Sequence, residues 1–284
     1  MHSLGKERGA GKLQRVATFY ALLSRLHKEY DAVFVHMNPE YLVLAGLWWR
    51  LAGKRVGLWY NHTVGSLWLK VGQLFTHKVF HTSPFAYTAR YGNAHRMPAG
   101  IDTNIFKPMP EIIKKPGSIY FQGRVSPAKR VHIILEAFDL LRQSGEEVTL
   151  TIAGPEDEAY VAPLKQKYAQ YLEEGVLTFL GPQKHSETPK LFNEHTVSIN
   201  LTDDGNYDKT VLESLACGTP AIVSSKAFAD APVISIEVPK AKYVAEALSH
   251  FFINQNQGKL VEYVEKEHGL EKLSRTLYEQ YARN

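Results

Sequence analysis

The 284-residue sequence contains a single cysteine, Cys217. One cysteine forms neither an intramolecular disulfide nor a cysteine-rich zinc site, and this scarcity indicates a reducing compartment. Long hydrophobic runs are missing too: the longest apolar stretch, residues 41–49, is about half of the ~20 residues that a membrane-spanning helix needs. The first thirty residues are basic and amphipathic and lack the apolar core of a signal peptide. These absences predict a soluble, cytoplasmic protein.

Motifs of several enzyme classes are also missing. The sequence has no G-x-G-x-x-G fingerprint, which argues against dinucleotide oxidoreduction, and no G-x-S-x-G elbow of serine hydrolases. Residues 5–12 resemble a phosphate-binding loop only superficially, because they lack its spacing and its Ser or Thr.

Acidic residues are scarce in the first part of the chain. Residues 1–106 contain 13 Lys and Arg against 5 Asp and Glu, whereas residues 107–284 contain 20 against 24. The basic part also holds all four tryptophans, Trp48, Trp49, Trp59 and Trp68. Basic surface beside aromatic side chains suits nucleic acid, anionic lipid or an anionic small molecule. A packed core with a solvated rim explains the same pattern equally well.

From residue 107 onward, short β-branched or aromatic runs alternate with helical stretches. The pattern predicts strands at 118–121, 148–153, 176–180, 197–200, 221–224 and 233–236, and helices at 130–144, 160–172, 187–193, 210–217 and 240–256. Strands separated by helices form a parallel sheet with right-handed crossovers, which binds ligands at the carboxyl ends of its strands. The strand-to-helix loops are therefore the places to search for a site.

The first part repeats this unit with fewer copies. Its pattern predicts strands at 32–36, 55–60 and 78–82 and helices at 12–30, 39–51 and 63–75. The segment 98–116 is rich in Pro and Gly, and the charge changes sign there, so we expect the linker within it. The sequence thus predicts an α/β protein with two domains, residues 1–106 and 107–284, whose last helix packs back on the first domain.

Two loops of the second part can carry chemistry. Residues 123–130 (GRVSPAKR) follow the first strand, and their small residues, helix start and two cations, Arg124 and Lys129, suit a diphosphate. Residues 203–220 run into a short apolar helix that contains Glu213, a carboxylate that ribose hydroxyls can satisfy if it is buried. Solvated basic residues at an ordinary turn, and a glutamate facing solvent, are the alternatives.

Both loops resemble motifs of one enzyme family. Residues 123–130 are similar to G-R-[VL]-S-x-x-K-[GR], and residues 211–220 are similar to V-L-E-[AS]-x-A-C-G-x-P, both of the retaining glycosyltransferases of family 4. The order of the supporting segments, 150–155, 176–181 and the helix from Glu187, is also similar. The resemblance covers residues 31–284 and implies a GT-B fold, with two Rossmann-like domains facing across a cleft and the first domain truncated.

The resemblance also implies roles for individual residues. Arg124 and Lys129 would bind the donor diphosphate and stabilise the leaving group, Glu213 would take the ribose hydroxyls, and Pro182 and Gln183 would lie beside the base. His62, at a strand end where the family often has a histidine, would lie near the donor sugar. The implied donor-binding set is Gly123, Arg124, Lys129, Pro182, Gln183, Asp204, Gly205, Asn206, Tyr207, Asp208, Lys209, Thr210 and Glu213, and the implied catalytic set is His62, Arg124 and Lys129.

One position departs from the family pattern. Eight residues before Glu213 the family commonly has a second carboxylate, whereas this chain has Gly205. The neighbouring Asp204 and Asp208 keep the loop polar. Recognition of sugar hydroxyls by position 205 is therefore in doubt, although some relatives carry a similar D-K-[TV]-V-L-E form.

The implied reaction moves a hexosyl group from a nucleoside diphosphate sugar, UDP- or GDP-linked, to a hydroxyl of a glycan or lipid-linked acceptor with retention. No Asp-x-Asp triplet occurs, which argues against the metal-dependent glycosyltransferases with the other common fold, so we expect neither metal nor cofactor. Such a reaction belongs to polysaccharide or glycolipid biosynthesis. A non-catalytic nucleotide-sugar-binding fragment or subunit that needs a partner, and a nucleotide-sugar epimerase of the same fold, are the alternatives.

Family members normally begin with a strand, a glycine-rich loop and a helix ahead of anything similar to this chain's start. Without that first strand, residues 32–36 would form a bare apolar sheet edge that invites a second copy or a partner chain. The basic helix 12–30 is a candidate for peripheral contact with the inner face of an anionic membrane, and a solubilising face is its alternative. We expect no nucleic-acid partner.

Overall fold

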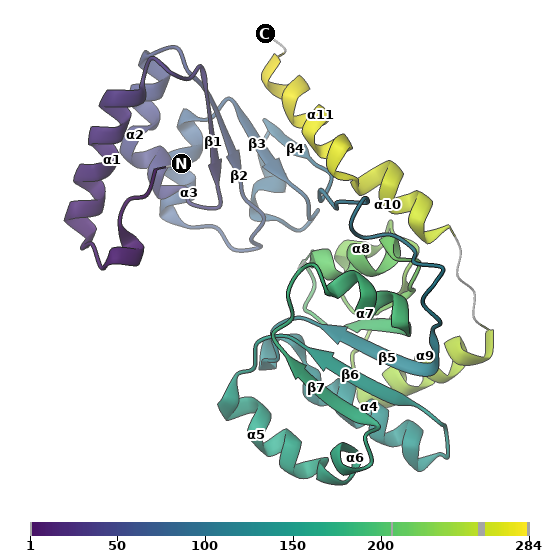
Figure 1. The fold of residues 1–284 in the computed structure, drawn as a ribbon. Helices are drawn as coiled ribbons and strands as arrows, with labels where there is room; N and C mark the ends of the chain where they lie inside the picture. The colour runs from purple at the N-terminus through teal and green to yellow at the C-terminus, as the bar shows by residue number, and fades with distance from the viewer. Residues whose placement is uncertain (1, 206, 255–258, 283–284) are drawn as a thin grey trace.

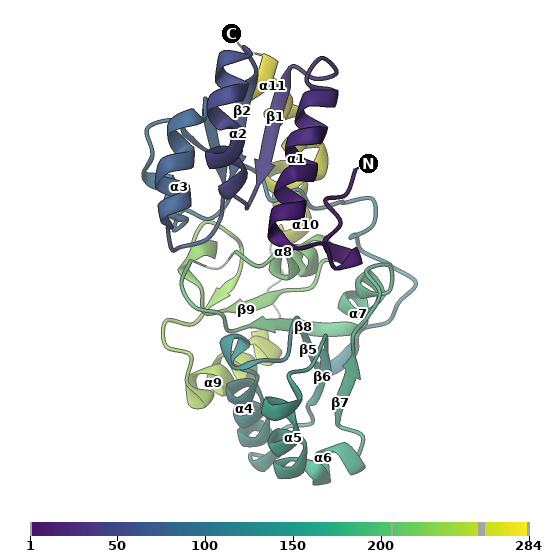
Figure 2. The same ribbon diagram turned by 90° about the vertical axis from the view of Figure 1, so that its left-hand side faces the viewer.

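The computed structural model describes residues 2–205, 207–254 and 259–282. These residues form two parallel sheets, one of four strands and one of six, in two lobes (Figure 1). The strands of the first sheet point toward the second lobe, so their carboxyl ends face it (Figure 2). None of the helices formed by the described residues is long and apolar enough to cross a bilayer.

The first sheet has the strand order β1-β2-β3-β4, with β1 at an edge. Its strands are β1 (Ala32–His36), β2 (Arg55–Trp59), β3 (Lys78–His81) and β4 (Ala94–Arg96). The helical elements of this lobe are η1 (Lys6–Arg8), α1 (Lys12–Leu26), α2 (Glu40–Leu51), α3 (Leu67–Gly72), η2 (Gln73–Phe75) and η3 (Tyr87–Arg90). Apolar side chains of α1, α2 and α3 pack on one face of the sheet, where Val35, Val56 and Leu58 are buried.

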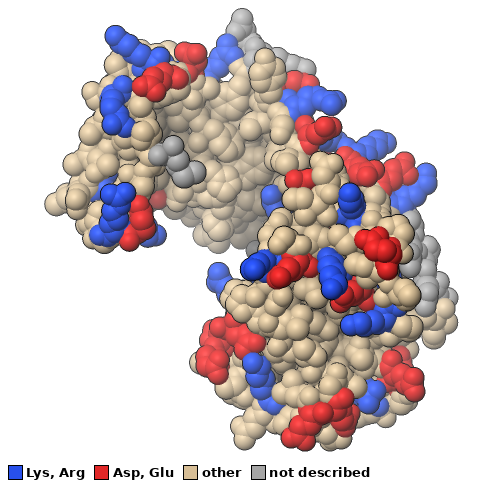
Figure 3. Space-filling view, in the orientation of Figure 1, with Lys and Arg blue, Asp and Glu red and all other residues tan. Residues whose placement is uncertain are grey.

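The C-terminal helix α11 (Leu270–Ala282) lies on the opposite face of the first sheet (Figure 1). The Tyr281 hydroxyl donates to the Val33 carbonyl at 3.0 Å, and its ring lies 6.1 Å from that of Phe80. A Cβ at Gly57 would lie 2.1 Å from the Tyr281 hydroxyl oxygen. The helix therefore depends on a glycine in β2. Beside it the surface is hollowed and shows few charged side chains (Figure 3), and Phe34 of β1 is 41% exposed.

The second sheet has the order β10-β9-β8-β5-β6-β7. Its strands are β5 (Lys115–Gln122), β6 (Thr149–Ala153), β7 (Leu177–Gly181), β8 (His195–Asn200), β9 (Ala221–Val223) and β10 (Ile234–Ser235). Its helical elements are η4 (Pro127–Lys129), α4 (Val131–Gln143), α5 (Glu158–Lys167), α6 (Ala169–Glu173), α7 (Thr188–Glu194), α8 (Lys209–Ala216), η5 (Lys226–Phe228), α9 (Ala241–Asn254) and α10 (Leu260–His268). One buried cluster joins the sheet to α4, α5 and α9, and another joins it to α7, α8 and α10.

Polar contacts of residues 96–101, which follow the first sheet, join the two lobes. The amides of Gly100 and Ile101 donate to the His268 carbonyl at 3.0 and 2.8 Å, and Arg96 pairs with Asp230 at 2.8 Å. The predicted division at residue 106 stays a prediction.

Most of the predicted strands and helices are confirmed, and several differ in their bounds. The helix predicted from residue 63 begins at Leu67, because the Ser66 hydroxyl accepts the Leu69 amide at 3.1 Å and caps it there. The helix predicted at 160–172 is divided into α5 and α6 at Tyr168. The strand β4 and the helices α10 and α11 were not predicted, and the predicted helix 240–256 extends beyond the described residues.

Candidate functional site

Glycines bring the carboxyl ends of β5, β6 and β7 together. The Gly123 amide donates to the Ala153 carbonyl at 2.9 Å, and the Gly154 amide donates to the Gly181 carbonyl at 2.8 Å. A Cβ at Gly154 would lie only 1.8 Å from the Gly123 carbonyl oxygen, so no larger residue fits this backbone. Their φ angles of +154° and +140° also favour glycine. The first predicted loop thus starts where the backbones of Gly123, Gly154 and Gly181 pack closely together.

The two predicted cations of this loop have different surroundings. Arg124 is exposed and forms no hydrogen bond or ion pair with the described part of the chain. Lys129, at the end of η4, donates to the Asp208 carboxylate at 2.5 Å, and Asn200 donates to the same oxygen at 2.9 Å. Lys129 therefore joins the first predicted loop to the second, while Arg124 is free to meet an anion.

Arg130 extends this connection, and we did not predict it as a site residue. Its φ of +51° lies in the left-handed region, which a non-glycine residue seldom adopts. Its guanidinium pairs with Asp203 and donates to the Leu201 carbonyl at 3.3 Å. Its place as the last residue of the predicted motif was the available signal. The two loops are held together by two ion pairs.

Parts of the second loop contact other segments. Asp204 accepts the Lys226 amide at 2.9 Å and lies 3.5 Å from its ammonium. Tyr207 stacks on Phe228 with ring centroids 4.4 Å apart, and its hydroxyl lies 3.0 Å from Nε2 of His268. The structure thus places these two side chains against the β9–β10 segment and α10. Asn206 lies outside the described residues.

Glu213 is a largely buried carboxylate without a close partner. Its side chain is 12% exposed, and the described residues donate no hydrogen bond to it; the imidazole nitrogen Nε2 of His185 lies 3.9 Å from its Oε1. Burial raises the pKa of Glu213, and the nearby His185 and Lys209 lower it by a smaller amount. A buried carboxylate without donors is expected to accept hydrogen bonds from a ligand.

The remaining predicted donor residues lie around this carboxylate's helix and the end of β7. Lys209 is exposed and Thr210 is half-buried, both in the first turn of α8. The Gln183 amide folds back to donate to the carbonyls of Leu180 and Gly181, and Pro182 is exposed beside it.

On the role that the resemblance implies for Glu213, nucleotide binding is expected to weaken as the pH falls through the raised pKa of this residue, because the protonated carboxyl loses acceptor capacity for hydroxyl donors. Calorimetric titration with nucleotide between pH 4 and pH 8 measures this pH-dependent step in affinity, and Glu213→Gln should remove the step. A His185→Ala variant should keep it. Protonation of a group with a raised pKa favours the folded state, so this group does not weaken binding by unfolding the protein. A step that survives in Glu213→Gln would contradict the prediction.

The contact between the lobes explains why position 205 has no carboxylate. Gly205 has a φ of +93°, and a Cβ there would lie 2.4 Å from the Thr63 methyl carbon and 3.1 Å from Cβ of Phe85. Its carbonyl accepts the buried Ser83 hydroxyl at 2.8 Å. Residue 205 therefore joins the second loop to the first lobe and has no room for a side chain that could recognise a sugar.

Asn61 organises the first-lobe side of this contact and was not predicted. Its side-chain oxygen accepts the amides of Thr82 and Ser83, both at 2.9 Å. His62 follows it, with its carbonyl accepting the Tyr87 amide at 2.8 Å and its side chain exposed. The position of Asn61 beside the predicted His62 was the available signal. His36, the last residue of β1, stacks on Trp59 of β2 with ring centroids 6.3 Å apart.

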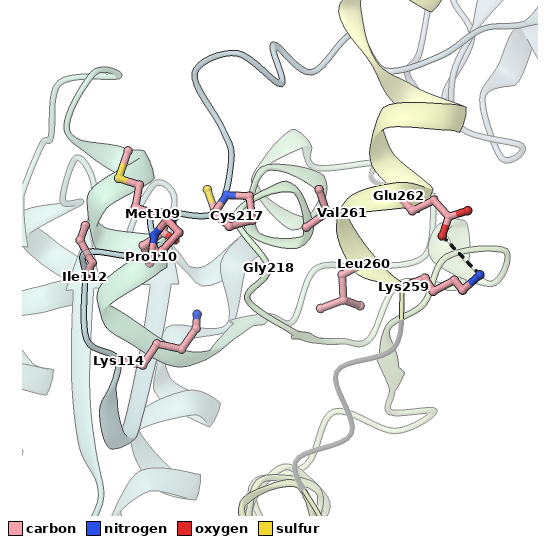
Figure 4. A pocket seen from close by; sticks show the side chains of 12 residues that line it. Met109, Pro110, Ile112, Lys114, Cys217, Gly218, Lys259, Leu260, Val261 and Glu262 are labelled. Carbon is pink, nitrogen blue, oxygen red and sulfur yellow. Dashed lines mark hydrogen bonds and ion pairs between the residues drawn. The ribbon is translucent and has the colours of Figure 1, made fainter.

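A cavity of about 440 Å³ lies at the other end of α8, around Cys217 and Gly218 (Figure 4). Lys114 points into it and donates to the His195 carbonyl at 3.2 Å and to the Thr219 hydroxyl. Burial raises the pKa of the Cys217 thiol to about 12, which makes it a poor nucleophile. None of the predicted site residues lines this cavity. Among the described residues, no cluster of His, Cys, Asp or Glu could hold a metal ion.

Comparison with solved structures identifies the architecture. Anabaena HepE, crystallised with UDP and glucose, superposes with a TM-score of 0.78 at 17% identity, over 95% of this chain and 83% of HepE. Sucrose-phosphate synthase from Thermosynechococcus elongatus gives 0.75 at 16%, over 94% of this chain and 76% of the synthase. The pneumococcal O-GlcNAc transferase GtfA gives a TM-score of 0.71 at 13% identity, over 96% of this chain and 60% of GtfA. The predicted GT-B fold, with a smaller first sheet, is confirmed.

Sequence comparison addresses the family directly. No curated protein matches the chain. Residues 102–266, more than half of the chain, match the family described as Glycosyl transferases group 1. That segment contains both predicted loops, the close-packed glycines Gly123, Gly154 and Gly181, and the buried Glu213. The chain therefore belongs to Glycosyl transferases group 1, the retaining GT-B glycosyltransferases that use nucleotide sugars.

Proposed function

We propose that the protein transfers a hexosyl group from a UDP- or GDP-linked sugar to a hydroxyl of a glycan or lipid-linked acceptor, with retention of configuration and without a metal. The observation that carries this proposal is the group of Arg124, Lys129 and Glu213 at one end of the second sheet. The guanidinium of Arg124 and the ammonium of Lys129 suit a diphosphate. The carboxylate of Glu213, to which the described residues donate no hydrogen bond, suits the hydroxyls of a ribose. HepE was crystallised with UDP-glucose, so UDP-glucose is the first donor to test.

We propose that Arg124 and Lys129 hold the diphosphate and stabilise its charge as the bond to the sugar breaks. The Lys129 ammonium donates to the Asp208 carboxylate, and a diphosphate would share this ammonium with Asp208. Glu213 accepts the ribose hydroxyls. Pro182 and Gln183 border the base, and Lys209 and Thr210 line the start of α8 beside it.

In this reaction the bond between the anomeric carbon and the diphosphate oxygen breaks, and the acceptor oxygen bonds to the anomeric carbon from the same face. The leaving phosphate oxygen takes the acceptor's proton, so the protein supplies orientation, charge and exclusion of water. His62, which the Asn61 contacts hold on the first lobe, faces the donor sugar in this arrangement.

Transfer is expected to continue at an unchanged rate in EDTA, because Arg124 and Lys129 neutralise the leaving diphosphate in place of a metal. The measurement is the initial rate of UDP release with and without chelator. Loss of activity that manganese restores would contradict the prediction. Conversion of the donor to a sugar of altered configuration without any acceptor would instead indicate an epimerase, and failure of every UDP-, GDP- and ADP-sugar to bind would indicate that a partner is required.

We also propose that the first lobe makes peripheral contact with an anionic membrane at the cytoplasmic side. Large apolar side chains are exposed before, on and after α3, namely Val64 (73%), Leu67 (75%), Trp68 (54%) and Leu74 (69%). Several large exposed apolar side chains on one short segment are typical of an interaction site. We therefore assign the proposed contact to α3 as well as to the basic helix α1. Pairing of a second chain at the β1 edge stays a prediction.

A further inference from the structure

A cavity of about 570 Å³ opens between the amino-terminal halves of α1, α2 and the start of α3. Its lining includes Lys12, Arg15, Val16, Phe19, Leu44 and Trp68. In Figure 2 these helices begin at the end of the first lobe that faces the second. The Gly205 loop meets the first lobe at the same end, through Thr63 and Ser83. The cavity therefore lies on the side of the lobe from which the donor site is reached.

The walls of this cavity are mainly apolar. Phe19 packs against Tyr41 with ring centroids 5.1 Å apart, and Val16 and Leu44 complete the apolar lining. Trp68 lies at the cavity and is 54% exposed. The volume falls within the roughly 300–1,000 Å³ typical of pockets that bury small organic ligands. An apolar chain is the chemical group that these walls suit.

Charge at the same cavity favours an anion. Lys12 and Arg15 face it from α1, against the single carboxylate of Glu40 from α2. Nε of Arg15 is buried and has no hydrogen-bond partner among the described residues. A buried donor without a partner is costly, and a guanidinium matches the oxygens of a phosphate in geometry and charge. An anionic hydrogen-bond acceptor in the cavity would therefore stabilise the buried Nε of Arg15.

We propose that this cavity binds the acceptor substrate, an amphiphile with its apolar chain against Val16, Phe19 and Leu44 and its phosphate or diphosphate on Arg15 and Lys12. The inference rests on the proposed function and selects the lipid-linked acceptor over the free glycan. Exposed apolar side chains of α3, Leu67 and Val71, lie beside the rim at Trp68 and provide a route from a bilayer.

The test uses the full chain and decyl phosphate, kept below its micelle concentration, as a soluble probe. Isothermal calorimetry should show saturable one-to-one binding. Arg15→Gln should weaken this binding at least tenfold, and Leu44→Trp, which fills the cavity, should abolish it. Decanol should bind at least tenfold more weakly than decyl phosphate, and inorganic phosphate alone should not bind.

The matched control is Arg25→Gln, which removes the same charge from α1 about 15 Å farther along the helix, outside the cavity. It should change decyl phosphate binding less than twofold. UDP binding, measured on the same samples, should be equal in all variants, which separates this inference from the proposed donor site. Unsaturable binding, or binding that Arg15→Gln and Leu44→Trp leave unchanged, would overturn the inference. So would binding to anionic vesicles with none to decyl phosphate, since membrane docking would then account for the charge.

Discussion

Replacing Arg124 with alanine is expected to reduce the rate of sugar transfer about 10²- to 10³-fold. The guanidinium is exposed and unpaired within the described part of the chain, and the proposed function assigns it to the donor diphosphate. Removing one group that stabilises developing charge typically costs a factor of this size. Initial rates with saturating donor, and the dissociation constant for UDP by calorimetry, measure the effect. The free energy of unfolding should change by less than about 0.5 kcal/mol, because an exposed side chain without partners is lost.

The matched control for this variant is Arg275→Ala on α11, which removes another exposed arginine and should leave the transfer rate unchanged. Lys129→Ala is a less clear test, because it also leaves Asp208 without its cation. Unchanged rates and nucleotide affinity in Arg124→Ala would show that the diphosphate lies elsewhere.

Replacing Gly154 with alanine is expected to destabilise the second lobe by about 3 kcal/mol or more. The new Cβ would lie 1.8 Å from the Gly123 carbonyl oxygen, which is backbone and cannot turn away as a side chain does. Relief requires separating β5 from β6, whose ends the Gly123 and Ala153 hydrogen bond joins. A substitution that combines a steric conflict with backbone strain belongs to the most destabilising class. Urea denaturation followed by circular dichroism measures the loss.

Gly145→Ala provides the control, since Gly145 also has a positive φ, +87°, but a Cβ there would meet nothing within 4 Å. It isolates the conformational cost, about 1–2 kcal/mol for a left-handed alanine. Equal destabilisation by the two variants would show that the close approach at Gly154 costs nothing of its own.

The parts of the fold that follow from local pattern could be predicted from the sequence. The buried strands of the second sheet read as short apolar runs, and the helices between them show a periodic apolar face, as in α4. The loop positions of Arg124 and Lys129 followed from the same alternation, because the carboxyl ends of parallel strands lie on one edge of the sheet. Glu213 followed from the apolar helix that comes after the next such loop.

The contacts between the lobes could not be predicted, because they join residues distant in sequence. Nothing near Gly205 indicates that Thr63 and Phe85 occupy the space of its side chain. Likewise, the Tyr207 side chain reads as a polar loop residue, and only the position of α10 explains its contact with His268. The strand β4 is three residues long and has a weakly apolar sequence, so it gave no strand pattern.

The course of α11 has a consequence for building chimaeric enzymes. The helix belongs to the last part of the sequence, yet Tyr281 packs on the first sheet above Gly57. A single crossover in the linker would therefore place a foreign helix on this sheet, and a hybrid with a larger residue at position 57 would collide with it. Exchange of the second lobe between relatives requires two junctions, one before β5 and one between α10 and α11, so that the first sheet keeps its own α11.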